Sequence, residues 1–421
     1  MTTTAPLARR LGTGDAVVIG LSSMIGAGVF SAFGPAARAA GSGLLIGLAI
    51  AGGVAYCNAV ASAQLAAQYP TSGGTYVYGR ERLGESWGFV AGWGFVIGKT
   101  ASCAAMALTF ASYAAGGPLW ANRLVAVAAV VALTAANYHG ISRTVEAAWV
   151  LVGLSILALV VVVLAIATSG HTHGGIGSSS FGAYGVLQSA GLLFFAFAGY
   201  ARIATLGEEV RKPEETIPRA VPIALGIALA LYLAVGVAAL VGAGPAALAG
   251  SVRPLATAVN AGGAAWALPV VRIGAAVASL GALLALIAGV GRTTLAMARN
   301  SDLPRWLASV HPRYSVPDHA ELLIGAAVVV LVLTTDLRNA IGFSSFGVLL
   351  YYAIANASAY TQPKQRRRWP RGLNVVGLVG CVLLVTTLPW SAITAGVGVI
   401  AVGLLGRSLA VRRRRLQCEA G

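Results

Sequence analysis

The sequence predicts an all-α polytopic membrane protein. Of its 421 residues, 57% are hydrophobic and only 10% are charged. A soluble chain of this length needs more charged residues to cover its surface. The hydrophobic residues are also gathered in segments near the length of about 20 residues that a bilayer requires. Composition and segment length therefore indicate the same fold class.

The hydrophobic segments predict about twelve transmembrane helices, some of them tilted or broken. The ninth segment is short and the last two meet at Leu388-Pro389, so the alternative is a count that differs by one. The first segment is long and has no early cleavage site, so we expect no cleaved signal peptide. The segments lie at residues 14–39, 42–68, 85–115, 121–139, 146–169, 185–209, 218–244, 268–297, 319–335, 340–361, 372–388 and 389–407.

The net charge of +16 follows the predicted topology rather than a nucleic-acid surface. Most of the 29 Lys and Arg residues fall in the two tails and in alternate loops. Basic residues gather on the cytoplasmic side, so both termini are predicted to be cytoplasmic in the plasma membrane. We expect no nucleic-acid partner, whereas Arg412–Arg415 are suited to anionic lipid of the bilayer. The opposite loops hold only Arg38, Arg123, Arg253, Arg272 and Arg338.

Cysteine and histidine patterns exclude several classes of protein. The four cysteines have no paired spacing, which predicts neither disulfides nor a metal site. The histidines lie in loops or at segment ends, and no HExxH motif or paired aspartates occur within the segments, which argues against an intramembrane enzyme. The residues are Cys57, Cys103, Cys381, Cys418, His139, His171, His173, His311 and His319.

The stretch Ser22–Gly28 predicts a break in the first membrane helix. Gly26 and Gly28 lie within three residues of each other, and Gly20 comes just before them. A break inside a bilayer frees backbone groups that lipid cannot satisfy, so they must face protein, water or a ligand. The N-terminus of a half-helix attracts a carboxylate, and the C-terminus of the other half offers carbonyl groups to a cation. One break can therefore hold both ends of a zwitterion.

A second glycine-containing stretch, Phe194–Arg202, lies inside the sixth hydrophobic segment. Interrupted segments at corresponding positions of two halves indicate a transporter site. If helix 6 repeats helix 1, each half has five spans and the halves have inverted topology. The expected parts are a cytoplasmic tail (1–13), two five-helix repeats (14–169 and 185–361), two additional helices (372–407) and a basic cytoplasmic tail (408–421).

Four stretches of the chain resemble the amino acid–polyamine–organocation (APC) superfamily of secondary transporters. They are GLSSMIGAGVF in helix 1, QYPTSGGTYVY after helix 2, FFAFAGYARIATLGEEVRKPEETIPRA across helix 6 and its loop, and GRTTLAMARNSDLP at the end of helix 8. They occur in the family's order, and the resemblance covers nearly the whole chain. It implies the leucine-transporter-type fold, with alternating access around a site between helices 1 and 6.

The resemblance also implies which residues bind substrate. The N–H groups of Ile25, Gly26, Ala27 and Gly28 would receive a carboxylate. The aromatic side chains would cover the pocket at the second break, which includes Gly199, and Phe195 would act as a gate. Phe194 is expected only to pack. Carbonyl groups near Ser23, Met24, Phe195 and Ala198 would hold an ammonium group, and the covering aromatic residues would be Phe195, Phe197 and Tyr200.

Two departures from the family concern coupling and gating. Proton-coupled relatives carry a lysine on helix 5 where this chain has Gly153, and many relatives have an acid where it has Ala201, followed by Arg202. Arginine stays protonated, so Arg202 is a fixed charge in the cation site, a clamp for a carboxylate, or half of an ion pair with an acid such as Glu208 or Glu209. The other alternative is a side chain that extends to the lipid headgroups. Lys99, on helix 3 near mid-membrane, is a titratable candidate for the coupling group, with a structural pair as the alternative.

Three acidic residues lie at the inner ends of helices. Asp15 is expected to cap helix 1. Glu208 and Glu209 follow helix 6, where they are either solvated or take part in proton transfer or gating.

The favoured function is a secondary active transporter that moves amino acids by alternating access. The positive charge of Arg202 and the missing acid favour neutral amino acids. The alternative within the class is a transporter or exchanger of cationic amino acids or polyamines, and the alternative from another class is a non-transporting sensor or subunit. No organic cofactor or metal is expected. H⁺ is the expected coupling ion and Na⁺ the less favoured one, and the sequence predicts no oligomeric state.

Overall fold

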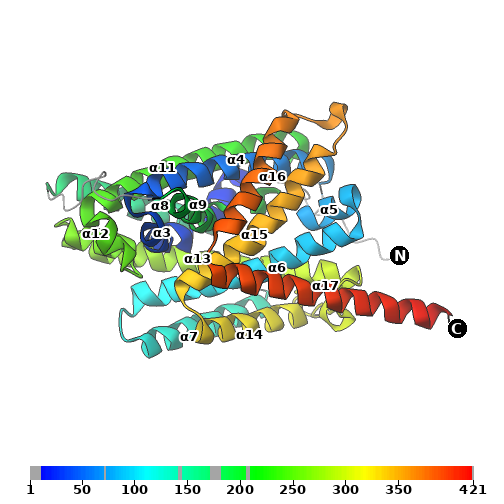
Figure 1. Ribbon diagram of the computed structural model, residues 1–421. Coiled ribbons are helices and arrows are strands. Elements are labelled where there is room, and N and C mark those ends of the chain that lie inside the picture. Colours follow the sequence, from blue (N-terminus) through cyan, green and yellow to red (C-terminus); the bar gives the residue numbers. More distant parts are fainter. Residues whose placement is uncertain (1–10, 71–72, 141–144, 171–181, 205–208, 420–421) are drawn as a thin grey trace.

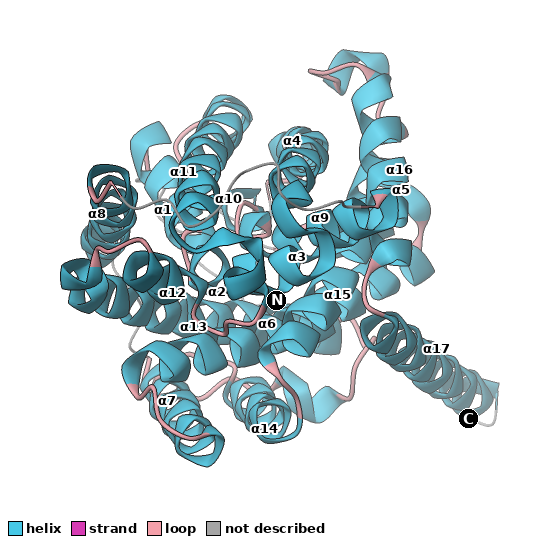
Figure 2. Cartoon of the chain, turned by 60° about the vertical axis from the view of Figure 1, so that its left-hand side comes forward, coloured by secondary structure: helices cyan, strands magenta, loops and turns pink. Residues whose placement is uncertain are grey.

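The computed structural model describes residues 11–70, 73–140, 145–170, 182–204 and 209–419. In these ranges the chain is a bundle of helices without a β-sheet (Figures 1 and 2). The predicted all-α fold class is confirmed. Nine helical stretches of the described residues are long and apolar enough to cross a membrane, and α9 and α16 are shorter apolar helices.

The first half of the chain contains the interrupted first helix and four long helices. A short helix, α5, lies between the second and third of the predicted spans. The elements are α1 (Thr13–Met24), α2 (Ala27–Ser31), α3 (Phe33–Ala40), α4 (Leu44–Gln68), α5 (Thr75–Leu83), α6 (Glu85–Ala114), α7 (Leu119–Tyr138) and α8 (Val145–Thr168).

The second half begins with the other interrupted helix. Another short helix, α12, follows the seventh predicted span. The elements are α9 (Ala183–Phe197), α10 (Ala201–Ala204), α11 (Pro213–Ala249), α12 (Pro254–Ala261), α13 (Leu268–Arg299), α14 (Asp318–Thr334), α15 (Leu337–Tyr360), α16 (Arg371–Thr387) and α17 (Trp390–Glu419). Each predicted span has a helical counterpart, while the inverted repeat stays a prediction.

Burial separates central helices from peripheral ones. The most apolar windows of α6 and α15 are 78% and 83% buried, whereas those of α7 and α17 are 17% and 11% buried. Glycines let the two central helices cross closely, because a Cβ atom on Gly347 would overlap backbone atoms of Gly94 and Gly98. Small residues serve this purpose in membrane helices because they let two backbones approach.

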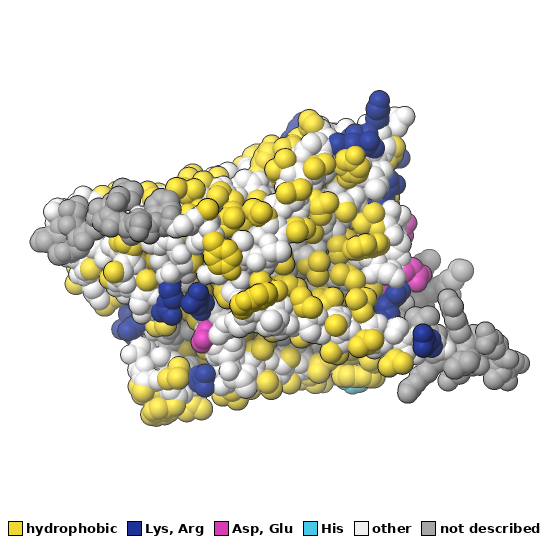
Figure 3. All heavy atoms as spheres, viewed as in Figure 1, with side chains coloured by type: hydrophobic (Ala, Val, Ile, Leu, Met, Phe, Trp, Pro, Cys, Tyr) yellow, Lys and Arg dark blue, Asp and Glu magenta, His cyan; other side chains and the backbone are white. Residues whose placement is uncertain are grey.

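The two ends of the bundle differ in what they carry. We call the end with α5 and the C-terminal part of α17 the terminal face, and the end with α3 and α12 the opposite face (right and left in Figure 1). In the space-filling view, hydrophobic side chains cover the middle of the visible side and the Lys and Arg side chains lie toward its two ends (Figure 3). This distribution is that of a protein that crosses a bilayer.

A group of charged side chains joins four elements at the terminal face. Asp302, whose side chain is 5% exposed, pairs with Arg80 at 2.8 Å and with Arg407 at 2.8 Å. The Tyr76 hydroxyl donates to the same carboxylate at 2.7 Å. Burial, followed by this hydrogen bond, raises the pKa of Tyr76 well above its ordinary value. The exposed Glu85 contacts both arginines, so the group ties α17 to α5, α6 and the loop after α13.

The structure differs from the sequence prediction in three places. The short helices α5 and α12 lie where only loops were expected. The basic segment expected as a tail after residue 407 continues α17 to Glu419. Helix α11 runs to Ala249 rather than ending near residue 244, with a kink at Gly244, whose φ of 74° is one that glycine adopts without strain.

Candidate functional site

The two predicted breaks are present and lie against each other. Helix α1 ends at Met24, and Ile25 and Gly26 leave the helical conformation before α2 begins. Helix α9 ends at Phe197, and three residues separate it from α10. A Cβ atom on Gly199 would overlap the Ser23 carbonyl group. Glycine at position 199 therefore allows the two interrupted helices to touch at their breaks.

A cavity of about 100 Å³ lies at this crossing, and we call it the central cavity. Its walls come from both breaks and from α6 and α13. Four of the eleven predicted substrate-binding residues line it, namely Ser23, Phe195, Ala198 and Gly199. A volume of this size holds several water molecules or part of a small solute.

At the first break, two of the four predicted carboxylate donors are already engaged, and none of Ile25, Gly26, Ala27 and Gly28 lines the central cavity. The N–H groups of Ile25 and Gly26 bond to the carbonyl groups of Leu21 and Met24 at 2.7 and 2.8 Å. From Ala27 onward, the first N–H groups of α2 have no acceptor within their own helix. Gly28 lies against α9, where a Cβ atom would be 2.6 Å from the Cα atom of Ala196.

At the second break, Lys99 contacts the interrupted helix directly. Its Nζ atom donates to the Ala198 carbonyl oxygen at 3.0 Å, and its side chain is buried. Tyr352 approaches the same oxygen at 3.4 Å. A lysine 99 residues away in sequence thus binds a carbonyl group that the resemblance had implied for the substrate's ammonium group.

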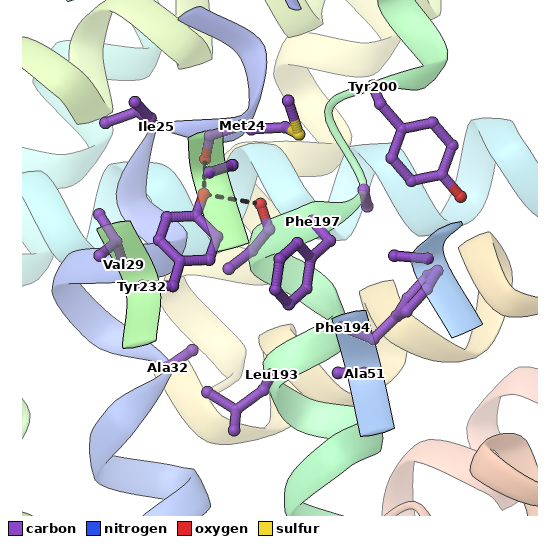
Figure 4. Close-up of a cluster of buried hydrophobic side chains, with 14 of the residues drawn as sticks. Met24, Ile25, Val29, Ala32, Ala51, Leu193, Phe194, Phe197, Tyr200 and Tyr232 are labelled. Atoms are coloured by element: carbon purple, nitrogen blue, oxygen red, sulfur yellow. Dashed lines mark hydrogen bonds between the residues drawn. The ribbon is translucent and has the colours of Figure 1, made fainter. Parts of the chain in front are cut away.

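Tyr232 holds the two interrupted helices together, and sequence reasoning missed it. Its hydroxyl lies 2.7 Å from the Met24 carbonyl oxygen and 3.1 Å from that of Ala196 (Figure 4). The Met24 carbonyl is therefore also engaged by a side chain. Tyr232 lies inside the long apolar helix α11, where no sequence pattern distinguishes it from a packing residue.

The predicted aromatic residues separate into two groups. Phe195 lines the central cavity. Phe194 packs against Tyr352, with ring centroids 5.8 Å apart, as expected. Phe197 packs on Tyr232, and Tyr200 stacks on Tyr352. Phe197 and Tyr200 are fully buried and do not line this cavity, so their side chains pack around the second break on the side away from the cavity.

Within the ranges that the structure describes, three cationic side chains and one carboxylate line the central cavity. Lys99, Arg202 and Arg292 supply the positive charge, and Glu209 the negative charge. Arg292 was not among the site residues predicted from the sequence. The cavity wall extends to the exposed Arg292, near the end of α13 that approaches the terminal face.

Two predicted coupling positions lie elsewhere. Gly153 is on an exposed face of α8 with open space around it, and it does not line the central cavity. Glu208 lies outside the described residues. Asp15 accepts a hydrogen bond from the Gly12 N–H at 3.0 Å, so its predicted role as a cap of helix 1 is confirmed.

Contacts close the opposite end of the bundle. The Arg38 guanidinium donates to the Ala249 carbonyl oxygen at 3.0 and 2.9 Å. The Tyr113 hydroxyl donates to the Phe30 carbonyl oxygen at 2.8 Å. These contacts join α2 and α3 to α6 and α11 on the side away from Arg292, so the central cavity faces the terminal face.

Interrupted apolar helices that meet at a cavity with charged side chains in its wall are typical of a polytopic membrane transporter. A family model described as "Amino acid permease" matches residues 11–405. The chain therefore belongs to the amino acid permease family, and its resemblance to the APC superfamily is confirmed. The protein is a transporter of this family and not an enzyme.

Relatives of the chain carry three kinds of name. An uncharacterized transporter of Mycobacterium tuberculosis is 59% identical over 99% of this chain and 94% of its own length. A branched-chain amino acid permease of Bacillus subtilis is 26% identical over 95% of this chain and 92% of its own length. The chloroplastic cationic amino acid transporter 7 of Arabidopsis thaliana is 28% identical, over 91% of this chain and 70% of its own length.

Proposed function

We propose that the protein is a secondary active transporter of neutral amino acids that works by alternating access in the plasma membrane. The observation that carries this proposal is the central cavity at the contact between the two helix breaks. The distribution of basic residues supports placing the terminal face in the cytoplasm. The closed opposite end then corresponds to an inward-facing state.

The substrate's charged ends have matching backbone groups. The first N–H groups of α2, at Ala27 and Gly28, are donors for the carboxylate. The carbonyl groups of Ser23 and Phe195 are the proposed acceptors for the ammonium group, since Tyr232 and Lys99 occupy those of Met24 and Ala198. The Phe195 ring closes the cavity over the substrate and serves as its gate.

The charge of the cavity wall favours neutral over cationic side chains. Among the described residues, Lys99, Arg202 and Arg292 outnumber Glu209, and a cationic substrate side chain would add a further positive charge at low dielectric. The alternative is a carrier of cationic amino acids or polyamines, which the names of the plant relatives favour. A sensor that binds amino acids without moving them is the alternative of another class.

We assign proton coupling to Lys99. Its contact with Ala198 links a titratable side chain to the interrupted helix that rearranges in alternating access. Loss of the proton leaves an amine with one donor fewer, which weakens the contact with the Ala198 carbonyl group and so links the charge of Lys99 to the position of the interrupted helix. Na⁺ is the less favoured ion, because an ammonium group already occupies this acceptor.

Uptake into proteoliposomes tests the proposal. We would measure a mixture of radiolabelled L-amino acids with and without an inward proton gradient, for the wild type, Lys99→Met and the exposed control Lys364→Met. We expect the proton gradient to drive uptake of neutral amino acids by the wild type and by Lys364→Met but not by Lys99→Met. This result would support both the neutral substrate class and proton coupling through Lys99. Uptake that is the same with and without the gradient would refute proton coupling. Binding of amino acids without uptake would favour the alternative function as a sensor.

A further inference from the structure

A second cavity of about 150 Å³ lies beside the central cavity, between α7, α10, α13 and α14. We call it the side cavity. Arg202 and Arg292 line both cavities, so the two spaces meet at these arginines. Space of this size holds several water molecules or the charged end of a small solute. A solute that leaves the central cavity toward the terminal face passes the same arginines.

Glu321, which lines the side cavity, is a carboxylate that forms no ion pair with the part of the chain that the structure describes. It lies in the first turn of α14 and is 2% exposed. Its Oε2 atom is enclosed and has no hydrogen-bond partner in the described part of the chain, where Glu321 also forms no ion pair. A buried carboxylate without such bonds is costly, so the position calls for a ligand or a proton.

The neighbouring helix makes room for this carboxylate. A Cβ atom on Gly291 would be 2.9 Å from the Cγ atom of Glu321. Asn137 on α7 also lines the side cavity, and its amide group donates to the Leu284 carbonyl oxygen at 3.0 Å. Glycine on α13 therefore admits a glutamate where a larger residue would exclude it.

Positive and negative charges lie on different sides of the side cavity. Arg202 and Arg292 are close enough to repel each other, and Glu321 lies within electrostatic reach of Arg292 and of Asp318. The site therefore offers positive charge toward the central cavity and a carboxylate toward α14. A lone anion would leave Glu321 unmatched, and a lone cation would be repelled by the arginines. A small zwitterion satisfies both groups.

We propose that the side cavity is a second, release-side binding site for a zwitterionic amino acid. The substrate's carboxylate binds Arg292 and Arg202, and its ammonium group binds the carboxylate of Glu321. Both contacts are charge-assisted hydrogen bonds, which are stronger than neutral ones. The inference rests on the proposed function, because it concerns the same substrate after it leaves the central cavity.

Exchange kinetics from each side of the membrane test this site. We would measure exchange of radiolabelled L-leucine by the full-length protein in right-side-out and inside-out membrane vesicles. The variants are Glu321→Gln and Arg292→Gln, and the control is Glu81→Gln, an exposed acid of α5 that lines neither cavity. Arg292 is itself exposed, so its variant is expected to fold even if the Glu321 variant does not.

The expected result is one-sided. In both variants the half-saturating leucine concentration rises about tenfold on the terminal face, the change that follows from losing one charge-assisted contact, and is unchanged on the other face. Equal changes on both faces, or none in either variant, would overturn the second site. If the wild type and the control exchange neither leucine nor any other neutral amino acid, the proposed function itself has failed.

Discussion

Gly199 is the residue at which the two interrupted helices make their closest contact. Because a Cβ atom there would overlap the Ser23 carbonyl group, we expect Gly199→Ala to separate the breaks and lower initial leucine uptake at least about tenfold, an effect of about 1.4 kcal/mol. Gly153→Ala is the matched control, since nothing lies within 4 Å of that position. Equal uptake by the two variants, at equal protein in the membrane, would contradict this interpretation.

Tyr232 bonds to a carbonyl group of each interrupted helix. Tyr232→Phe keeps the ring on Phe197 but removes the donor, so Met24 and Ala196 each lose a hydrogen-bond partner. We expect a loss of about 1–3 kcal/mol in unfolding free energy, the cost of unsatisfied buried acceptors, seen as a lower melting temperature in detergent. The exposed Tyr56→Phe, in α4, should leave the melting temperature unchanged.

Helix α17 depends on the charged group at Asp302. Asp302→Asn removes the shared carboxylate and leaves Arg80 and Arg407 facing each other at partly buried positions. Breaking a buried ion pair lowers the unfolding free energy by about 3–5 kcal/mol. Because both arginines are partly exposed, we expect Asp302→Asn to lower it by about 3 kcal/mol or less. Thermal unfolding measures the loss. Glu85→Gln should lower the unfolding free energy much less, because that side chain is 72% exposed. Equal losses in the two variants would argue against Asp302 as the centre of the charged group.

At the scale of elements, hydropathy predicted the membrane-spanning helices, whereas two short helices between them were not predicted. The long apolar segments and the glycines at Gly26 and Gly199 predicted the spans and both breaks. Helices α5 and α12 lie in short polar or mixed stretches, where no helical period extends far enough to be recognised.

The candidate site was predicted only in part, for the same physical reason. A single polar residue in a long apolar helix gives no sign of its direction. Tyr232 was therefore not recognised as a neighbour of the breaks, and Arg292 and Glu321 were not recognised as cavity-lining residues. Lys99 was found because a charge at mid-membrane is costly and therefore conspicuous. Its contact with the Ala198 carbonyl group was not predicted, because the packing that brings two residues 99 positions apart together cannot be read from a single sequence.

The whole molecule is closed at the opposite face and has its central cavity toward the terminal face, which predicts one-sided access. A cysteine at Thr293, which lines this cavity, should react with a membrane-impermeant thiol reagent in inside-out vesicles and not in right-side-out ones. Cys57, Cys103 and Cys381 are buried, so Cys418→Ser gives a suitable background.

Weakening the closed end should reverse this preference. Tyr113→Phe removes the donor that joins α6 to the Phe30 carbonyl group, which favours opening toward the opposite face. If the molecule alternates between two states, labelling at position 293 from the terminal side must then fall, because each molecule open to one face is closed to the other. Unchanged labelling in the Tyr113→Phe variant would mean that closure at the two faces is not linked, and alternating access would fail for this protein.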